Sequence, residues 1–146
     1  MSYIINSKLS IEYINETQVK VLVTYNLAEE ALSPRKYKEE ISLIGDDPGT
    51  NNDKKIFIFP IKTFQSKAGK LKNDPFEPDI IPGNNPRSSI PYVIDKSLLN
   101  EDPGLSANGQ GLKDEIKAQI LLTVINSSDS TPETIAVFTN TVQRAF

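Results

Sequence analysis

The sequence predicts an all-β protein, a single antiparallel β-sandwich of about seven strands, and three observations support this class. Several segments alternate between apolar and polar residues with a period of two, and their apolar positions are rich in Val, Ile and Leu. Clusters of Pro, Asn, Asp and Gly separate these segments. The chain carries no heptads and no internal repeat. About seven antiparallel strands in 146 residues are typical of a two-sheet sandwich, so we expect residues 1–146 to form one domain.

The clearest predicted element is a hairpin near the N-terminus. Residues 7–14 and 18–27 both alternate with a period of two. The apolar face of the second segment consists of Val19, Val21, Val23, Tyr25 and Leu27. Residues 15–17, Asn-Glu-Thr, supply the turn between the two strands.

A turn and a third strand are predicted next. Residues 28–32 favour one helical turn, which ends before Pro34 because the residue before a proline avoids the α region. Residues 37–44 alternate again, although Glu39 falls on the otherwise apolar face. Residues 45–53 form a dense cluster of turn residues.

The middle of the chain combines a proline-interrupted strand with a long proline-rich segment. Residues 54–64 predict a strand, and Pro60 places it at a sheet edge or a bulge because proline cannot donate a ladder hydrogen bond. Residues 65–91 contain five of the ten prolines and little periodicity. A loop of that length in a compact domain is functional, packed or disordered. The apolar residues that indicate packing are Phe76, Ile80 and Ile81.

Three more strands are expected in the C-terminal part. Residues 92–99 predict a short strand. Residues 113–125 fit a strand or a helix, and we favour the strand because the apolar run continues to its end. Residues 134–146 predict the last strand. Because Phe146 would be poorly placed in water, we expect this end to pair within the sandwich or to accept a strand from a neighbouring subunit.

The composition disfavours several classes of function. The chain has no His, Cys or Trp, which removes the commonest general base at neutral pH, thiolate nucleophiles, and imidazole and thiolate metal ligands. A net charge of −3 gives no general attraction to nucleic acid or anionic membranes. The longest apolar run, residues 120–122, continues past Thr123 only with Val124 and Ile125 and is far too short to span a membrane, and residues 1–8 lack a signal-peptide pattern. We therefore expect a cytoplasmic protein, or one in a particle assembled in the cytoplasm, with no nucleic-acid partner.

Two local patterns have a chemical and an ordinary interpretation. Ser33 and Lys36 match a Ser-x-x-Lys spacing, but no partner motif accompanies them and Pro34 suits a turn, so no catalytic residue is assigned. Residues 53–72 hold six lysines against Asp53. Such a stretch could contact phosphates, but lysines on an edge strand also protect it from pairing with other chains, which is the favoured interpretation.

The best metal candidates are Asn100, Asp102 and Asp114. Ca²⁺ takes about six to eight oxygen ligands from carboxylates, amides and carbonyls of flexible loops. The stretch resembles the third calcium loop of C2 domains, where two acidic residues separated by one residue close a strand and an acidic pair before Ile opens the next. The resemblance implies a C2-like sandwich with a calcium-dependent lipid or ligand site. It departs at Asn100, where Asp is expected, and the first calcium loop is not recognisable, so solvated turn residues are the favoured interpretation.

The sequence thus favours a non-enzymatic sandwich, Ig-like or C2-like, that serves protein–protein binding or structural assembly as a component of a larger particle. The expected partner is another protein or further copies of the chain in a homo-oligomer, with no cofactor. Residues 65–91 and 100–112 are the expected contact elements, because binding surfaces on rigid sandwiches lie in loops. Two alternatives are a calcium-dependent C2-like lipid- or ligand-binding domain and a carbohydrate-binding or glycan-active domain, which the absence of Trp disfavours.

Overall fold

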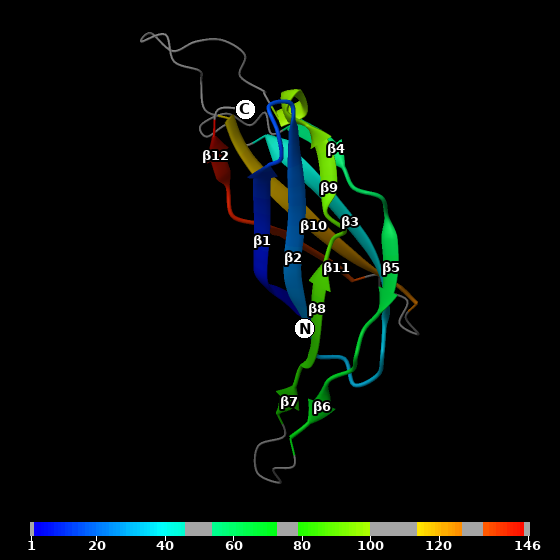
Figure 1. The fold of residues 1–146 in the computed structure, drawn as a ribbon. Helices are drawn as coiled ribbons and strands as arrows, with labels where there is room; N and C mark the ends of the chain where they lie inside the picture. The colour runs from blue at the N-terminus through cyan, green and yellow to red at the C-terminus, as the bar shows by residue number, and fades with distance from the viewer. Residues whose placement is uncertain (1, 46–53, 73–78, 100–113, 127–132, 145–146) are drawn as a thin grey trace.

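The protein is almost entirely β in a computed structural model that describes residues 2–45, 54–72, 79–99, 114–126 and 133–144 (Figure 1). Within these ranges the helical element is one 3₁₀ turn, η1 (Lys96–Leu99). The strand pairs in the described ranges are antiparallel. The predicted all-β class is confirmed.

The first sheet is built around the long strand β2. Its strands are β1 (Tyr3–Tyr13), β2 (Gln18–Glu29), β8 (Gly83–Ser88) and β9 (Tyr92–Asp95). One side of β2 pairs with β1, and the other pairs with β8 and β9. The predicted hairpin is confirmed, and Asn15 sets its turn because its Oδ1 accepts hydrogen bonds from the amides of Thr17 and Gln18 at 2.9 Å each.

The second sheet has β3 and β10 at its centre. Its strands are β3 (Lys36–Gly45), β4 (Lys54–Ile58), β5 (Lys62–Gln65), β10 (Asp114–Asn126), β11 (Thr134–Phe138) and β12 (Val142–Arg144). β4 and β5 follow one another along one edge, and β11 and β12 follow one another along the opposite edge. The ambiguous segment at 113–125 is strand β10. Its alternating inward residues are fully buried: Ile116, Ala118, Ile120 and Leu122.

The structure describes twelve strand elements where the sequence predicts about seven. Pro60 breaks one predicted strand into β4 and β5, which confirms its edge position, and residues 139–141 split the last one. The proline-rich segment adds β8 and a small separate sheet of β6 (Lys70–Leu71) and β7 (Ile80–Ile81). The helical turn predicted at 28–32 is wrong. Ala28 and Glu29 continue β2, because pairing with β8 outweighs their local helix preference.

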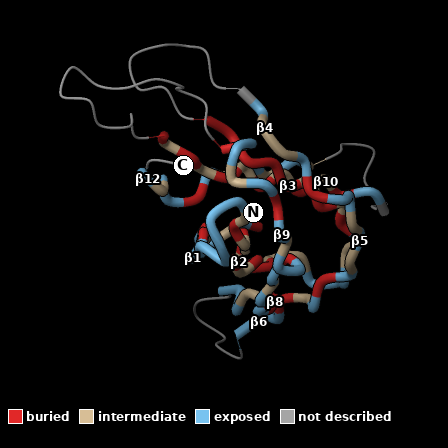
Figure 2. The backbone as a smooth tube through the Cα atoms, turned by 45° about the horizontal axis from the view of Figure 1, so that its top comes forward, coloured by how far each residue is buried: buried red, intermediate tan, exposed pale blue. Residues whose placement is uncertain are grey.

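One hydrophobic cluster fills the space between the two larger sheets. It combines the inward residues of β1, β2, β3, β9 and β10. Figure 2 shows buried residues, in red, recurring along the strands of the sandwich. Phe57 and Phe59 meet Tyr92 of the opposite sheet along one side of the sandwich, with ring centroids 6.2 and 5.0 Å from Tyr92. This shared core is what makes the fold a sandwich.

The other side of the sandwich is closed by side-chain hydrogen bonds to β1. Asn140 accepts from the amide of Leu9 at 2.8 Å and donates to its carbonyl at 3.2 Å. Arg144 donates to the carbonyl of Ile11 at 2.8 Å, and β12 pairs with residues 114–116 of β10. The C-terminal strand is therefore paired within its own sandwich, as one of the two predicted arrangements requires. Phe146 lies outside the described residues.

Candidate functional site

Two buried glutamates lie between the sheets, and a tyrosine of the opposite sheet donates a hydrogen bond to each. Tyr25 and Glu29 come from β2, whereas Tyr37 and Glu39 come from β3. The Tyr37 hydroxyl donates to Glu29, and the Tyr25 hydroxyl donates to Glu39. All four residues are buried. Each of the two sheets therefore contributes one tyrosine donor and one glutamate acceptor to the buried space between them.

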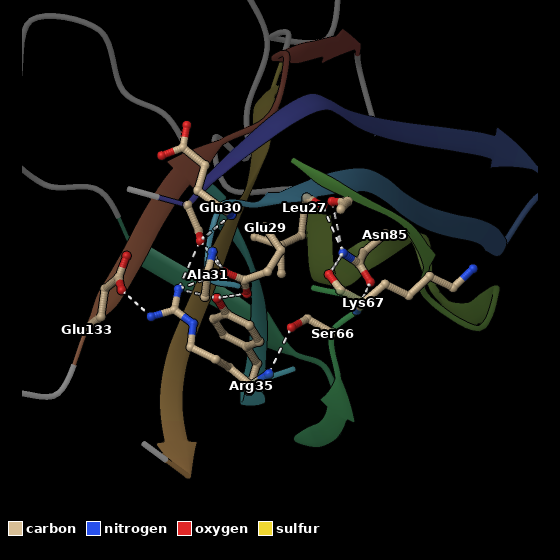
Figure 3. A network of polar contacts seen from close by, with 12 residues as sticks. Leu27, Glu29, Glu30, Ala31, Arg35, Ser66, Lys67, Asn85 and Glu133 are labelled. Atoms are coloured by element: carbon tan, nitrogen blue, oxygen red, sulfur yellow. Dashed lines mark hydrogen bonds and ion pairs between the residues drawn. The ribbon is translucent and has the colours of Figure 1, made fainter. Parts of the chain in front are cut away.

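Glu29 is the centre of a larger polar network at one end of the sandwich (Figure 3). It accepts hydrogen bonds from the Ser2 hydroxyl and, at 2.9 Å, from the Ala31 amide. Arg35 Nη2 lies 3.0 Å from Glu29 Oε1, and Arg35 Nη1 lies 2.6 Å from Glu133 Oε2. The guanidinium therefore links Glu29 of β2 to Glu133, the residue before β11, and has a carboxylate partner on each side.

The environment fixes the charge state of these groups at neutral pH. Burial alone would raise the pKa of Glu29, but hydrogen bonds from Ser2, Tyr37, the Ala31 amide and Arg35 outweigh it and hold that pKa below its usual value. Burial, reinforced by the Glu29 carboxylate, raises the pKa of Tyr37. Glu29 is therefore an anion and Tyr37 a neutral donor, which is the protonation that their hydrogen bond needs.

The second glutamate is paired in the same way. Arg87 Nε lies 3.4 Å from Glu39 Oε2, and burial followed by the nearby Glu39 raises the pKa of Tyr25. The Arg87 guanidinium also lies 4.1 Å from the ring centroid of Phe64, which stacks on Tyr37 at 5.5 Å. Phe64 thus contacts Tyr37 of the first pair and Arg87, the partner of Glu39 in the second.

The Glu29 network holds the segment that leads into β6. The Arg35 amide donates to Ser66 Oγ at 3.1 Å, and the Ser66 amide donates back to the Arg35 carbonyl at 2.8 Å. The Gly69 amide donates to the Ala31 carbonyl at 2.8 Å. A Cβ at Gly69 would lie 2.7 Å from the Glu29 carbonyl oxygen, so glycine is required where this segment crosses the end of β2.

Asn85 holds the returning segment after β7. Its Oδ1 accepts from the Lys67 amide at 2.8 Å, and its Nδ2 donates to the carbonyls of Gly83 and Leu27 at 3.1 and 3.3 Å. A Cβ at Gly83 would lie 2.1 Å from the Lys67 carbonyl oxygen. Residues 66–69 before β6 and 83–85 after β7 therefore contact each other and the sandwich through hydrogen bonds and close backbone approaches. We call these residues the base of the β6–β7 pair.

The β6–β7 pair, called the ribbon below, projects beyond the end of the sandwich in Figure 1. Leu71 pairs with Ile80, and Ile81 pairs with Lys70. Leu71, Ile80 and Ile81 are 57%, 36% and 42% exposed. Leu71 and Ile80 share one face of the ribbon and Ile81 lies on the other, so large apolar side chains are presented to solvent on both faces, which is typical of a contact surface.

The candidate calcium ligands are not brought together by the described part of the chain. Asn100 and Asp102 lie outside the described residues, whereas Asp114 is fully buried at the start of β10, in register with Arg144. Within the described ranges, no group of three or more acidic side chains is arranged to hold a metal ion.

The other two sequence patterns have ordinary positions. Ser33 lies in the connection between β2 and β3, and Lys36 begins β3, so the Ser-x-x-Lys spacing does not fall on a helical turn. The lysines of residues 54–72 are spread over β4, β5, β6 and the segments between them. The sequence did not indicate the Glu29–Arg35–Tyr37 network, whereas the second pair left one sign, Glu39, a charged residue on an apolar strand face.

Comparisons with known proteins support the fold. No family model and no curated protein matches the sequence. The structure is similar to the crystal structure of a protein from Archaeoglobus fulgidus, with a TM-score of 0.51 and 14% sequence identity over 98% of this chain and 97% of that one. This similarity extends to the fold alone. In the described ranges, no helix has the length and apolar character that crossing a bilayer requires.

Proposed function

We propose that this chain is a non-enzymatic structural module that assembles with copies of itself through the ribbon. The observation that carries the proposal is the set of exposed apolar side chains on the ribbon, Leu71, Ile80 and Ile81. A soluble two-stranded ribbon gains nothing from such residues unless a partner covers them. The hydrogen-bonded base supports this role, because a contact element held in one conformation loses less entropy on binding.

The charges of the ribbon favour a second copy as the partner. Lys70 begins β6, Lys72 follows it and Asp79 precedes β7, and Lys72 Nζ lies 3.7 Å from Asp79 Oδ2 within one ribbon. When two identical ribbons pack face to face about a two-fold axis, the basic arm of each can lie against the acidic arm of the other. Opposite charges then flank the Leu71–Ile80 pair in the contact, an arrangement that selects the correct orientation.

The buried carboxylates support a structural role over a catalytic one. Glu29 and Glu39 accept hydrogen bonds from tyrosines and lie beside arginines, so their charges are used inside the fold. A general acid or base must instead reach a substrate from a cleft. The calcium-dependent alternative remains a prediction, because Asn100 and Asp102 lie outside the described residues.

Size-exclusion chromatography with light scattering tests the proposal over a wide range of protein concentration. We expect the mass to rise from the 16.2 kDa monomer towards a dimer or a higher multiple, and to fall again when salt screens the charges. The double variant Leu71→Ser, Ile81→Ser should stay monomeric. Ile58→Ser is the matched control because Ile58 is 62% exposed on β4, outside the ribbon, and it should associate as the wild type does.

Two results would overturn the proposal. One is a wild-type protein that remains a monomer at every concentration. The other is a double variant that associates as strongly as the wild type while Ile58→Ser does not, which would move the contact from the ribbon to the β4 edge. Circular dichroism of both variants should match the wild type, since the substituted side chains are exposed.

A further inference from the structure

A groove on the outer face of the first sheet is separate from the ribbon and from the buried network. It is an open depression of about 480 Å³, a volume within the range of roughly 300–1,000 Å³ typical of small-molecule sites. Thr24 and Asn26 of the central strand β2 line it, together with Asn6 of β1 and Pro86 and Ser88 of β8. Because Thr24 and Asn26 alternate with the buried residues of β2, they face outward between the two flanking strands.

The groove presents neutral hydrogen-bonding groups. Hydroxyls come from Thr24 and Ser88, and carboxamides from Asn6 and Asn26, so donors and acceptors are mixed. Among the described lining residues the charged one is Arg87, and its guanidinium is engaged by Glu39 and the Phe64 ring. Arg87 is therefore already paired, so the groove residues themselves offer an anion no free cation, while Lys8 faces outward from β1 opposite Thr24.

The Asn26 side chain is held in position. Its Oδ1 accepts a hydrogen bond from the Asn85 amide at 2.9 Å, and its Nδ2 donates to Asn84 Oδ1. A carboxamide fixed in this way loses little further conformational entropy when a ligand contacts it. Polar groups of binding sites are commonly preorganised in this sense.

Asn6 reaches the groove through an unusual backbone conformation. Its φ is 55°, and it lies in a bulge where the pairing of β1 with β2 shifts between Ile5 and Lys8. A positive φ is uncommon for a residue other than glycine, and bulges re-aim a side chain away from the regular strand direction. Such conformations cluster at functional sites, so the bulge is a second observation, independent of the groove volume, that points here.

An exposed aromatic ring lies on the same face. Ile5 pairs with Asn26 and Tyr3 with Ala28, so both side chains point outward from β1 on the sheet face that carries the groove, although neither lines it. Tyr3 is 42% exposed. Its ring offers an apolar surface with a polar hydroxyl, and it can cover the C–H face of a sugar in the absence of tryptophan.

We infer that this groove binds a neutral saccharide. Mixed hydroxyl and amide groups match the alternating donors and acceptors of sugar hydroxyls, and Tyr3 supplies the stacking surface. The groove residues are distinct from those of the ribbon, so saccharide binding does not depend on self-assembly.

A glycan array that contains neutral and anionic oligosaccharides provides the first test, followed by isothermal titration calorimetry with the best neutral oligosaccharide on the array. Thr24→Val removes one groove hydroxyl at nearly constant shape and should weaken binding roughly two- to tenfold, the effect of one hydrogen bond. Tyr3→Ala should weaken it at least as much. The matched control is Thr134→Val on β11, which is exposed on the other sheet and should leave affinity unchanged.

Each other outcome overturns the inference. Binding to no neutral glycan removes the site, and binding to anionic glycans alone removes the neutral class. Equal affinities for the wild type, Thr24→Val and Tyr3→Ala place the saccharide elsewhere on the molecule. Melting temperatures of the variants that match the wild type make a loss of binding attributable to the groove and not to unfolding.

Discussion

Replacement of Glu29 by Gln should lower the free energy of unfolding by about 3 kcal/mol, the lower end of the range for breaking a buried ion pair. Glu29 is fully buried, and its two oxygens accept from Ser2, Tyr37, the Ala31 amide and Arg35. Gln keeps the volume but removes the charge and turns one acceptor into a donor. The lower end applies because Arg35 keeps a second carboxylate partner, Glu133, at 2.6 Å.

The assay is urea unfolding followed by circular dichroism, which yields the unfolding free energy from midpoint and slope. Glu133→Gln is the matched control, because it removes a charge from the same guanidinium at a site that is 25% exposed. A partly exposed pair contributes less, so we expect a loss of about 1 kcal/mol there. A Glu29→Gln loss no larger than that of Glu133→Gln would refute the argument that burial makes Glu29 the centre of the network.

The wild type and Glu29→Gln should also differ in how the free energy of unfolding depends on pH. The folded-state pKa of Glu29 lies below its ordinary value of 4.5, so its contribution is fully present above about pH 4.5 and is lost as the pH falls towards the folded pKa. Wild-type stability should therefore decline on acidification below pH 4.5 more steeply than that of Glu29→Gln. Parallel declines would show that other carboxylates dominate acid unfolding.

Three further predictions concern other parts of the chain. Gly83→Ala should destabilise the protein by at least about 2 kcal/mol in urea unfolding, because the new methyl group would lie 2.1 Å from the Lys67 carbonyl oxygen, and wild-type stability would show that the ribbon base can move. Deletion of residues 142–146 should lower stability by more than about 1 kcal/mol, because β12 pairs with β10 and Arg144 bonds to Ile11; an unchanged melting temperature would contradict this. Millimolar Ca²⁺ should leave the melting temperature unchanged if Asp102 is a solvated turn residue, whereas a rise that Asp102→Asn abolishes would establish the calcium site.

The sheet architecture could be predicted where alternation was strong and unbroken. The hairpin of β1 and β2 and the strand β10 follow from inward residues at every second position, and Pro60 correctly marks an edge. The short strands β6, β7 and β8 could not be predicted, because strands of two to six residues carry too little periodic signal. β8 also contains Asn84, Asn85 and Pro86, residue types that are uncommon in strands. The conformation of these short strands is set by contacts such as Asn85 with Lys67 that only the tertiary structure provides.

The sequence indicated where a candidate contact element lies, but not its strand pairing or which of its side chains are exposed. Proline density marks residues 65–91, yet the exposure of Leu71 depends on how the Glu29 network directs the ribbon away from the core. A buried Glu or Arg has the same sequence appearance as an exposed one, unless it falls on an apolar face as Glu39 does. The groove on the first sheet left no sign in the sequence, because it results from a bulge at Asn6 and from strand order.

The interrupted outer strands have a consequence for how this protein behaves when it is concentrated. The outermost strands of the second sheet are each broken in two, none of the four pieces is longer than five residues, and β8 carries Pro86. β1 is the long edge of the first sheet, but a bulge between Ile5 and Lys8 interrupts it, and side chains of Asn140 and Arg144 occupy its backbone groups at Leu9 and Ile11. Amyloid-like growth needs a long continuous edge on which another chain can template its backbone. We therefore expect this sandwich to resist fibril formation even when many copies are held close together.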